Sequence, residues 1–231
     1  MPHAFFIYIP SIDLVYNGDN LMYNYDTSVN RGFAMTKYDQ MEELLKLNKG
    51  YLFSSLVEKE GISRTYLARF IKDRNLEKVA KGVYITEDTW NDSLFVLQHS
   101  NPKIVFSGET ALYLNQLMER EYSDIVVSVP EGHNGARLRE RGVIVHQEKE
   151  AVFGLGVTEV ETNYGNIVRA YNSERCICDL VRLRSKYEAQ TYKSAIKTYM
   201  RRKDKNLTRL IQYAETLKIR DEIDKYVEVM T

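Results

Sequence analysis

The sequence has few cysteines, no excess of either charge and no long hydrophobic run. It contains two cysteines among 231 residues, too few for a disulfide framework or a zinc module and in keeping with a reducing cytosol. Lys plus Arg and Asp plus Glu both number 32, so a case for nucleic-acid binding must come from local clusters. No apolar run approaches the ~18 residues that a membrane-spanning helix needs. We therefore expect a cytoplasmic chain with no membrane partner.

Motifs typical of enzymes are also missing. The loop Gly132-His133-Asn134-Gly135 lacks the lysine and serine of a phosphate-binding loop, and Gly154-Leu155-Gly156 lacks the third glycine of a dinucleotide fingerprint. No spacing in the middle of the chain matches a metal site or a nucleophile elbow. We interpret His133 as a solvated loop residue, and Cys176 and Cys178 as small core residues. The sequence thus predicts no catalytic residue, no metal and no cofactor.

The chain is long enough for two small domains, and 44% hydrophobic residues suffice for a packed core. Residues 1–35 differ from the rest, because they carry three acids and one base. Asn17-Gly18-Asp19-Asn20 is a turn signal between two pieces rich in Tyr, Ile and Val. Two interpretations of this extension stay open. It is either a loose hairpin or an over-long gene start, with the natural chain beginning at Met35.

Residues 36–86 have the pattern of a winged helix-turn-helix. Periodicity predicts helices over residues 36–47, 51–60 and 64–75, followed by short strands over 76–79 and 82–85. Gly61-Ile62-Ser63 separates the second and third helices. Glycine suits the left-handed residue that ends a helix, Ile62 can fill the corner, and Ser63 is a good N-cap. Two helices joined by such a turn, then a basic hairpin, are typical of a DNA reader with a wing.

The third helix is expected to bury one face and expose a basic one. Its apolar stripe consists of Leu67, Phe70 and Ile71, and the opposite side carries Arg64, Thr65, Ala68, Arg69 and Lys72. Between residues 63 and 81 there are six bases against two acids. Arginine on such a helix can bond guanine bidentately, whereas Lys78 and Lys81 on the hairpin can touch phosphate. The alternatives are a solvated basic face or a surface for protein contacts.

The rest of the chain reads as a mixed α/β domain that ends in basic helices. Short strands and helices alternate through residues 87–171. Residues 182–209 carry ten bases against two acids, the largest local charge excess in the chain. Tyr192, Ala195, Ile196, Tyr199 and Met200 provide a core face, and Lys193, Lys197 and Arg201 align four residues apart on one ridge. Such a ridge either solvates the surface or meets a polyanion. The expected fold is therefore α+β: an N-terminal winged helix-turn-helix over 36–86 and a mixed α/β domain over 87–231.

Several segments together resemble the AbiEi-type antitoxins. They are listed in chain order: Gly61-Ile62-Ser63-Arg64-Thr65-Tyr66-Leu67, Val79-Ala80-Lys81-Gly82-Val83-Tyr84, Phe106-Ser107-Gly108-Glu109-Thr110-Ala111-Leu112-Tyr113-Leu114, Val129-Pro130-Glu131-Gly132, Gly165-Asn166 through Tyr171, and Ser173-Glu174-Arg175-Cys176-Ile177-Cys178-Asp179-Leu180. Each piece is weak by itself, but their order and spacing are specific. The resemblance covers about residues 36–230 and leaves residues 1–35 outside.

The resemblance implies a non-enzymatic antitoxin and repressor of a bacterial type IV toxin–antitoxin system that aborts phage infection. It implies that the winged helix binds inverted repeats in the promoter of its own operon. It also implies that the C-terminal domain counters a nucleotidyltransferase-like toxin without a stable toxin complex. The DNA-binding residues carried over are Ser63, Arg64, Thr65, Tyr66, Arg69 and Lys72, with Lys78, Lys81 and Tyr84 on the wing.

A second surface follows from the basic helices. The candidate antitoxin or anion-binding surface comprises Lys186, Lys193, Lys197, Arg201, Arg202 and Lys203. Two other functions stay open. One is a winged-helix regulator whose α/β domain senses a small ligand. The other is a nuclease-related enzyme that uses middle-domain carboxylates such as Glu109 and Asp124.

Overall fold

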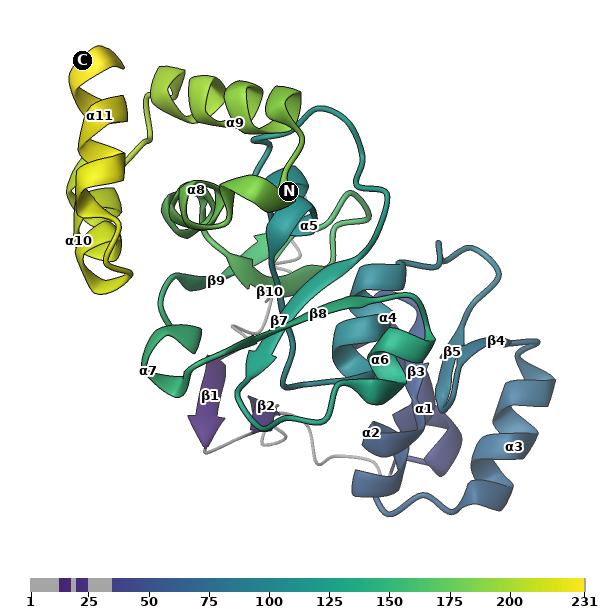
Figure 1. Ribbon diagram of the computed structural model, residues 1–231. Helices are drawn as coiled ribbons and strands as arrows, with labels where there is room; N and C mark the ends of the chain where they lie inside the picture. The colour runs from purple at the N-terminus through teal and green to yellow at the C-terminus, as the bar shows by residue number, and fades with distance from the viewer. Residues whose placement is uncertain (1–12, 18–19, 25–34, 231) are drawn as a thin grey trace, which may run out of the picture. The chain divides into compact units, whose positions relative to one another are not determined.

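The computed structural model describes residues 13–17, 20–24 and 35–230 (Figure 1). The chain divides into two compact units, the first ending at Asn91 and the second beginning at Asp92. Helices and small sheets occur in both, so the α+β class predicted from the sequence is confirmed. Strands β1 (Asp13–Asn17) and β2 (Asn20–Asn24) pair antiparallel on either side of the predicted turn. The turn residues 18 and 19, and the rest of residues 1–34, lie outside the described residues.

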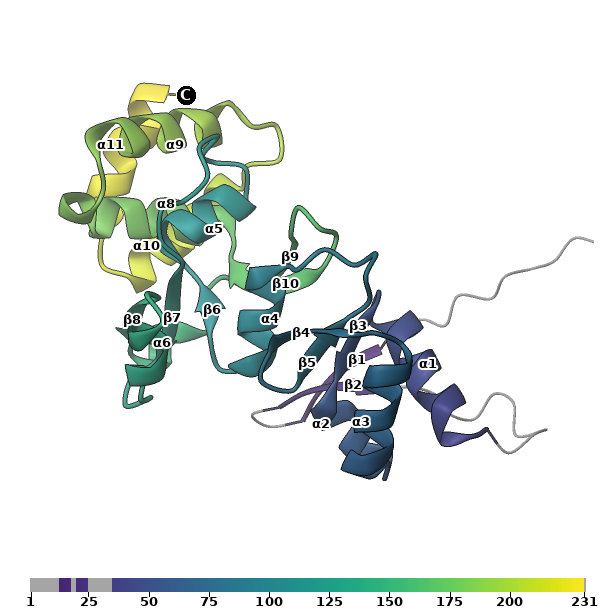
Figure 2. The ribbon, with the colours of Figure 1, turned by 90° about the vertical axis from the view of Figure 1, so that its right-hand side faces the viewer.

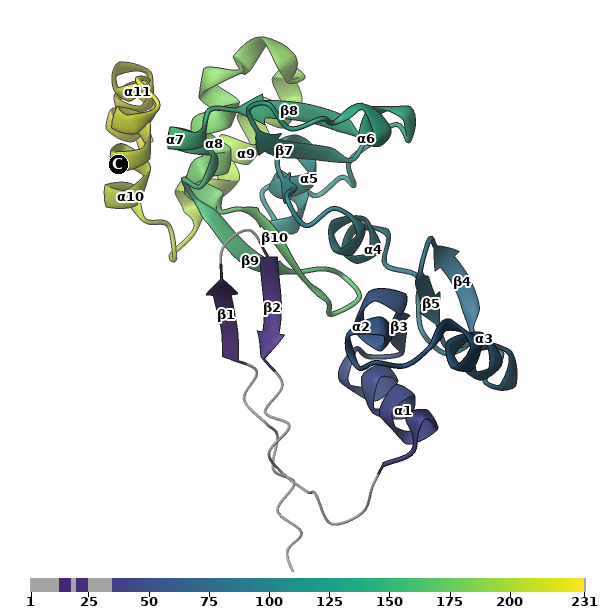
Figure 3. The ribbon, with the colours of Figure 1, turned by 90° about the horizontal axis from the view of Figure 1, so that it is seen from below.

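The first unit packs three helices on one core (Figure 3). The helices are α1 (Lys37–Leu47), α2 (Ser54–Lys59) and α3 (Arg64–Asp73). Helix α1 begins with a capping box, in which Thr36 and Asp39 satisfy each other's backbone N–H groups. The side chains of Met41, Val57 and Phe70, one from each helix, are fully buried. Helical periodicity therefore located all three helices.

The predicted start of the second helix is wrong. Residues Tyr51–Phe53 form strand β3 instead, and the helix begins at Ser54. All three strand residues are buried, and they pair antiparallel with β5 (Val83–Ile85). A short run that is buried on every side has no period from which a strand and a helix can be distinguished. Gly50, at φ +87°, turns the chain from α1 into this strand.

A third strand completes the sheet of the first unit. Strand β4 (Glu77–Ala80) pairs with the other edge of β5, which gives the order β3-β5-β4. Two residues, Lys81 and Gly82, join β4 to β5, and Gly82 has φ +74°. The register shifts between Lys78 and Ala80. The hairpin thus lies where the sequence predicts it, but it is short.

The second unit is built on a five-stranded mixed sheet in the order β8-β7-β6-β10-β9. The strands are β6 (Val105–Phe106), β7 (Val126–Pro130), β8 (Ile144–Glu148), β9 (Val157–Glu161) and β10 (Ile167–Tyr171). Two neighbouring pairs, β7 with β8 and β6 with β10, are parallel, and the others are antiparallel. The alternation of short strands and helices predicted for residues 87–171 is therefore present.

Helices follow and cover this sheet. In chain order they are α4 (Ser93–Ser100), α5 (Gly108–Leu114), α6 (Ala136–Glu140), α7 (Glu150–Phe153), α8 (Ser173–Arg182), α9 (Ala189–Arg201), α10 (Leu207–Thr216) and α11 (Arg220–Met230), with a 3-10 turn η1 (Arg184–Lys186) between α8 and α9. Helix α8 contacts α5, α9, α10 and α11, and the last three gather around it (Figure 2). The short helices α6 and α7 were not predicted, because four or five residues are too few to show a helical period.

Helix α8 also carries a buried ionic cluster. The guanidinium of Arg175 is fully buried, pairs with Asp179 at 3.0 Å and donates to the carbonyls of Val152 and Leu155. Arg182, one turn after Asp179, pairs with that carboxylate at 2.9 Å and with Glu148 of β8 at 2.5 Å. The cluster ties α8 to β8 and to the segment after it. Cys176 and Cys178 are buried on the same helix, as predicted.

Candidate nucleic-acid interface

The turn between α2 and α3 has the predicted corner but not the predicted capping bond. Gly61 has φ +69°, and Ile62 is 3% exposed in the core of the first unit. The carbonyl of Ser63 accepts the first hydrogen bond of α3, from the N–H of Leu67, so Ser63 occupies the N-cap position. Its hydroxyl makes no capping hydrogen bond, which nothing in the structure explains. This hydroxyl is exposed at the start of α3.

Helix α3 separates a buried face from an exposed basic face. Leu67 and Phe70 are buried. Thr65, Ala68, Arg69 and Lys72 are exposed, and on an α-helix these four positions fall within an arc of about 100°. Arg69 and Lys72 form no ion pair with any described residue. The exposed arc, called the α3 face below, therefore has two free positive charges beside two small side chains.

Two of the predicted reading residues lie at the edges of this face. Arg64 is directed toward α2, where its guanidinium meets the carboxylate of Glu58 at 2.9 Å. Tyr66 lies on the other flank, where the ammonium of Lys37 stands 4.7 Å from the centre of its ring. Both side chains are exposed, but neither is centred on the α3 face.

Contacts between α1 and α3 fix the orientation of the α3 face. The hydroxyl of Tyr38 donates to Asp73 at 2.6 Å, and this bond raises the pKa of the Tyr38 hydroxyl. Glu42 pairs with Arg74, and the rings of Tyr38 and Phe70 meet edge to face with centroids 5.3 Å apart. These contacts engage Asp73 and Arg74, which are both among the six bases and two acids counted in residues 63–81.

On the hairpin of β4 and β5, the predicted wing, the lysines are exposed but the tyrosine is not. Lys78 and Lys81 are exposed and pair with no described acid. Tyr84 is half-buried and packs against the core of the first unit, so its ring is mainly a packing element. Of the six bases counted between residues 63 and 81, Arg64 and Arg74 are paired. The four that stay unpaired are those of the α3 face and the wing.

The basic helices of the second unit are partly committed to the fold. Tyr192, Ala195, Ile196, Tyr199 and Met200 are buried, so the predicted core face of α9 is confirmed. Lys193, Lys197 and Arg201 are exposed on the opposite side of α9. Lys186 and Lys203, before and after the helix, are exposed as well. None of these five bases pairs with a described acid. Arg202 differs from these. Its guanidinium pairs with Asp204 at 2.6 Å and donates to the carbonyl of Asn115 at 2.7 Å, so it closes the end of α9 rather than extending a free surface.

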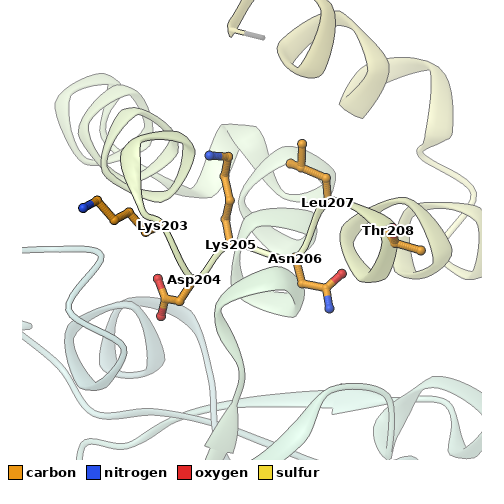
Figure 4. A pocket seen from close by; sticks show the side chains of 6 residues that line it. All are labelled: Lys203, Asp204, Lys205, Asn206, Leu207 and Thr208. Carbon is orange, nitrogen blue, oxygen red and sulfur yellow. The ribbon is translucent and has the colours of Figure 1, made fainter.

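A surface depression of about 450 Å³ lies where α9 leads into α10 (Figure 4). Six consecutive residues line it, Lys203 to Thr208, and no residue from another element does. In Figure 4 the side chains of Lys205 and Leu207 point to one side of the chain, and those of Asp204 and Asn206 to the other. The polar groups therefore do not converge on one point, as they do in a small-molecule site.

The residues considered for catalysis form no metal-binding cluster in the described part of the chain. Among the described residues, no three His, Cys, Asp or Glu side chains gather where they could hold a metal ion. Glu109 is half-buried at the start of α5, and Asp124 is exposed before β7. His133 is partly exposed in its loop. Burial raises the pKa of the Cys176 thiol well above its usual range and that of Cys178 to about 12, so both thiols stay protonated.

Within the part of the chain that the structure describes, every helix is too short or too polar to cross a bilayer. No protein-family model matches the sequence, and no curated protein does. Among solved structures, the chain is similar to the crystal structure of the RV2827C protein from Mycobacterium tuberculosis. The TM-score is 0.49 and the sequence identity 9%, over 81% of this chain and 78% of that one. A likeness at this level carries no inference about function.

Proposed function

We propose that the protein is a DNA-binding transcriptional regulator and that its first unit is a winged helix-turn-helix. The α3 face carries the proposal, because Arg69 and Lys72 are exposed and unpaired there, opposite the buried stripe of the helix. The order of elements, α1-β3-α2-α3-β4-β5, supports it as well. No described acid pairs with Arg69 or Lys72, so neither base is needed for an ion pair within the fold.

Each side chain of the α3 face suits a different part of a DNA duplex. The major groove is about 12 Å wide and admits one helix. Arg69, one turn after Thr65 on this face, has the donors to bond O6 and N7 of a guanine. Ala68 is small enough to let the helix approach the base edges, and Thr65 can contact a base at the helix start. Lys72, together with Lys78 and Lys81 of the wing, supplies charge for phosphates, which fixes position without reading sequence.

We further propose that the DNA is the promoter of the protein's own operon, with inverted repeats, and that the operon encodes a toxin. On this proposal, which rests on the resemblance to AbiEi-type antitoxins, the chain is cytoplasmic and not an enzyme. The second unit counters a nucleotidyltransferase-like toxin without forming a stable complex. The exposed bases of α9 support this part, since Lys193, Lys197 and Arg201 form a ridge that the fold does not use.

Binding to duplex DNA from upstream of the gene tests the proposal. Full-length protein is titrated against that duplex and against a scrambled duplex of the same composition, with fluorescence anisotropy as the signal. Arg69→Ala is expected to cost about 1–3 kcal/mol on the native duplex and to narrow the difference between the two duplexes. Lys46→Ala is the matched control, because Lys46 is exposed at the far end of α1. Equal affinity of the wild type for both duplexes, or an unchanged Arg69→Ala variant, would refute the proposal.

A further inference from the structure

We infer that Lys37 is a phosphate-contacting residue of the DNA interface and that Tyr66 positions it, rather than reading a base. This inference rests on the proposed function of the α3 face. It concerns two residues on different helices, α1 and α3, that the structure brings together at 4.7 Å between ammonium and ring centre. Tyr66 is among the DNA-binding residues that the resemblance to AbiEi-type antitoxins implies, and Lys37 is not.

The position of Tyr66 on α3 places its ring beside the groove wall instead of the base edges. Successive residues of an α-helix are about 100° apart, so Tyr66 is turned that far from Thr65, at one side of the α3 face. The helix with its side chains is about 10–12 Å across and fills the major groove. A residue on the flank of such a helix therefore faces the sugar-phosphate backbone.

The same flank faces α1. The contact of Tyr38 with Asp73 and that of Glu42 with Arg74 both join α1 to this side of α3. Lys37 is the first residue of α1 and is exposed. Its ammonium is thus held next to the first turn of α3, the end that approaches the bases in a helix-turn-helix.

The charge of Lys37 is free to act on a ligand. The nearest acid in sequence, Asp39, accepts hydrogen bonds from the backbone N–H and the hydroxyl of Thr36, at 3.0 and 2.7 Å. These bonds lower the pKa of Asp39 and keep its carboxylate on the helix cap. No described acid pairs with Lys37. The ring of Tyr66, 42% exposed, therefore orients the lysine without neutralising it, as a cation–π contact does.

The opposite flank of α3 is built differently, so the inference applies to the α1 side alone. There Arg64 meets Glu58, so a positive and a negative charge lie together on the α2 side. The α1 side carries the unneutralised cation. We expect the two flanks to contribute unequally to backbone binding, with Lys37 providing one full ionic contact and Arg64 less than one.

Salt-dependent titration of full-length variants tests this assignment. Lys37→Ala is expected to weaken binding to the native and scrambled duplexes alike, by roughly three- to tenfold at moderate salt. The slope of log affinity against log salt should fall by about one. Tyr66→Phe keeps the ring and should match the wild type. Tyr66→Leu keeps an apolar side chain but not the ring face, and it should lose affinity in the same sequence-independent way. Combining Tyr66→Leu with Lys37→Ala should cause little further loss of DNA affinity.

The outcomes separate this inference from the proposed function. Sequence preference that relaxes in Tyr66→Phe would show that the hydroxyl reads a base and would overturn the inference. So would an unchanged affinity and salt slope in Lys37→Ala, measured where Arg69→Ala clearly weakens binding. If the wild type shows no preference for the native duplex, the proposed function itself fails. Lys46→Ala, on the same helix about 14 Å away, controls for the loss of one charge.

Discussion

The two basic regions of the molecule use their charge differently. Residues 63–81 have six bases against two acids, and residues 182–209 have ten against two. By sequence the second region should be the stronger anion-binding surface. In the structure, Arg182 is bound by Glu148 and Asp179, Arg202 by Asp204, and Arg209 lies 3.7 Å from Glu174. Glu148, Asp179 and Glu174 lie outside residues 182–209, so a local count of charge omits them and overstates the free charge of the second region. The same count omits Glu58 and Glu42, which pair with Arg64 and Arg74 in the first region, but those two acids are more exposed.

The largest expected effect concerns a base that belongs to the fold. Arg182→Ala leaves Glu148 and Asp179, whose side chains are 11% and 8% exposed, without one of their partners. Removing one member of a buried pair costs about 3–5 kcal/mol, and we expect about 2–4 here because Arg182 is itself partly exposed. Urea denaturation measures the change. Lys186→Ala, an exposed base nearby, should stay within about 0.5 kcal/mol of the wild type. Equal stability of the two variants would contradict the division between structural and free bases.

The free bases of the second region should matter for function and not for folding. Lys193→Glu, Lys197→Glu and Arg201→Glu together should leave the free energy of unfolding nearly unchanged, since exposed substitutions are usually within about 0.5 kcal/mol of neutral. The triple variant should nevertheless rescue fewer cells that express the toxin. The matched control reverses three exposed arginines of the same unit, Arg137, Arg139 and Arg141.

Repression by the same triple variant sharpens the result. If repression falls together with rescue, the ridge touches DNA, and if it holds, the anionic partner lies elsewhere. Full rescue and full repression would reduce the ridge to a solvated surface.

In the first region, the wing lysines should contribute affinity without sequence preference. Lys78 and Lys81 are exposed and unpaired among the described residues, so each is expected to provide about one phosphate contact. Lys78→Ala and Lys81→Ala should each weaken binding to all duplexes and lower the salt slope by about one. Tyr84→Phe, which keeps the packed ring, should bind as the wild type does. A change of sequence preference in either lysine variant would mean that the wing enters a groove and reads bases.

The smallest expected effect is a difference in pH dependence between the two units. Burial, with help from the charges of Lys186 and Arg182 and against that of Glu148, lowers the pKa of His146. Because the folded-state pKa lies below the unfolded value, the contribution to stability is present above about pH 6.5 and is lost as the pH falls through the folded-state pKa.

The melting temperature of the second unit should therefore drop between pH 7.5 and pH 5.5, and His146→Gln should reduce the drop. Residues 36–91 contain no histidine, so the first unit should be less affected over this range. A drop in melting temperature confined to the first unit would contradict the assignment of this pH dependence to His146.

Features that depend on residues close in sequence were predictable. The buried and exposed sides of α3, the hairpin after it and the core face of α9 all follow from residues three or four positions apart or from a glycine turn. The strand at Tyr51–Phe53 was missed because its partner, β5, lies some thirty residues further along the chain. The structural role of Arg202 was missed for the same reason, since the carbonyl of Asn115 accepts its hydrogen bond.

The same limit applied to the candidate site. Sequence periodicity put Arg69 and Lys72 on an exposed face, and the structure places them there. Periodicity could not reveal that Tyr66 meets Lys37, that Arg64 meets Glu58 or that Tyr84 packs on the core. Each of these depends on a tertiary contact between elements, which no local pattern encodes.

Footprinting of the region upstream of the gene tests the central claim most directly. The wild type and Lys46→Ala are expected to protect two inverted half-sites, because the α3 face reads bases in the major groove. At the same protein concentrations Arg69→Ala should lose that protection while keeping its melting temperature. Equal protection by Arg69→Ala and the wild type, or no protected site for the wild type, would contradict the account.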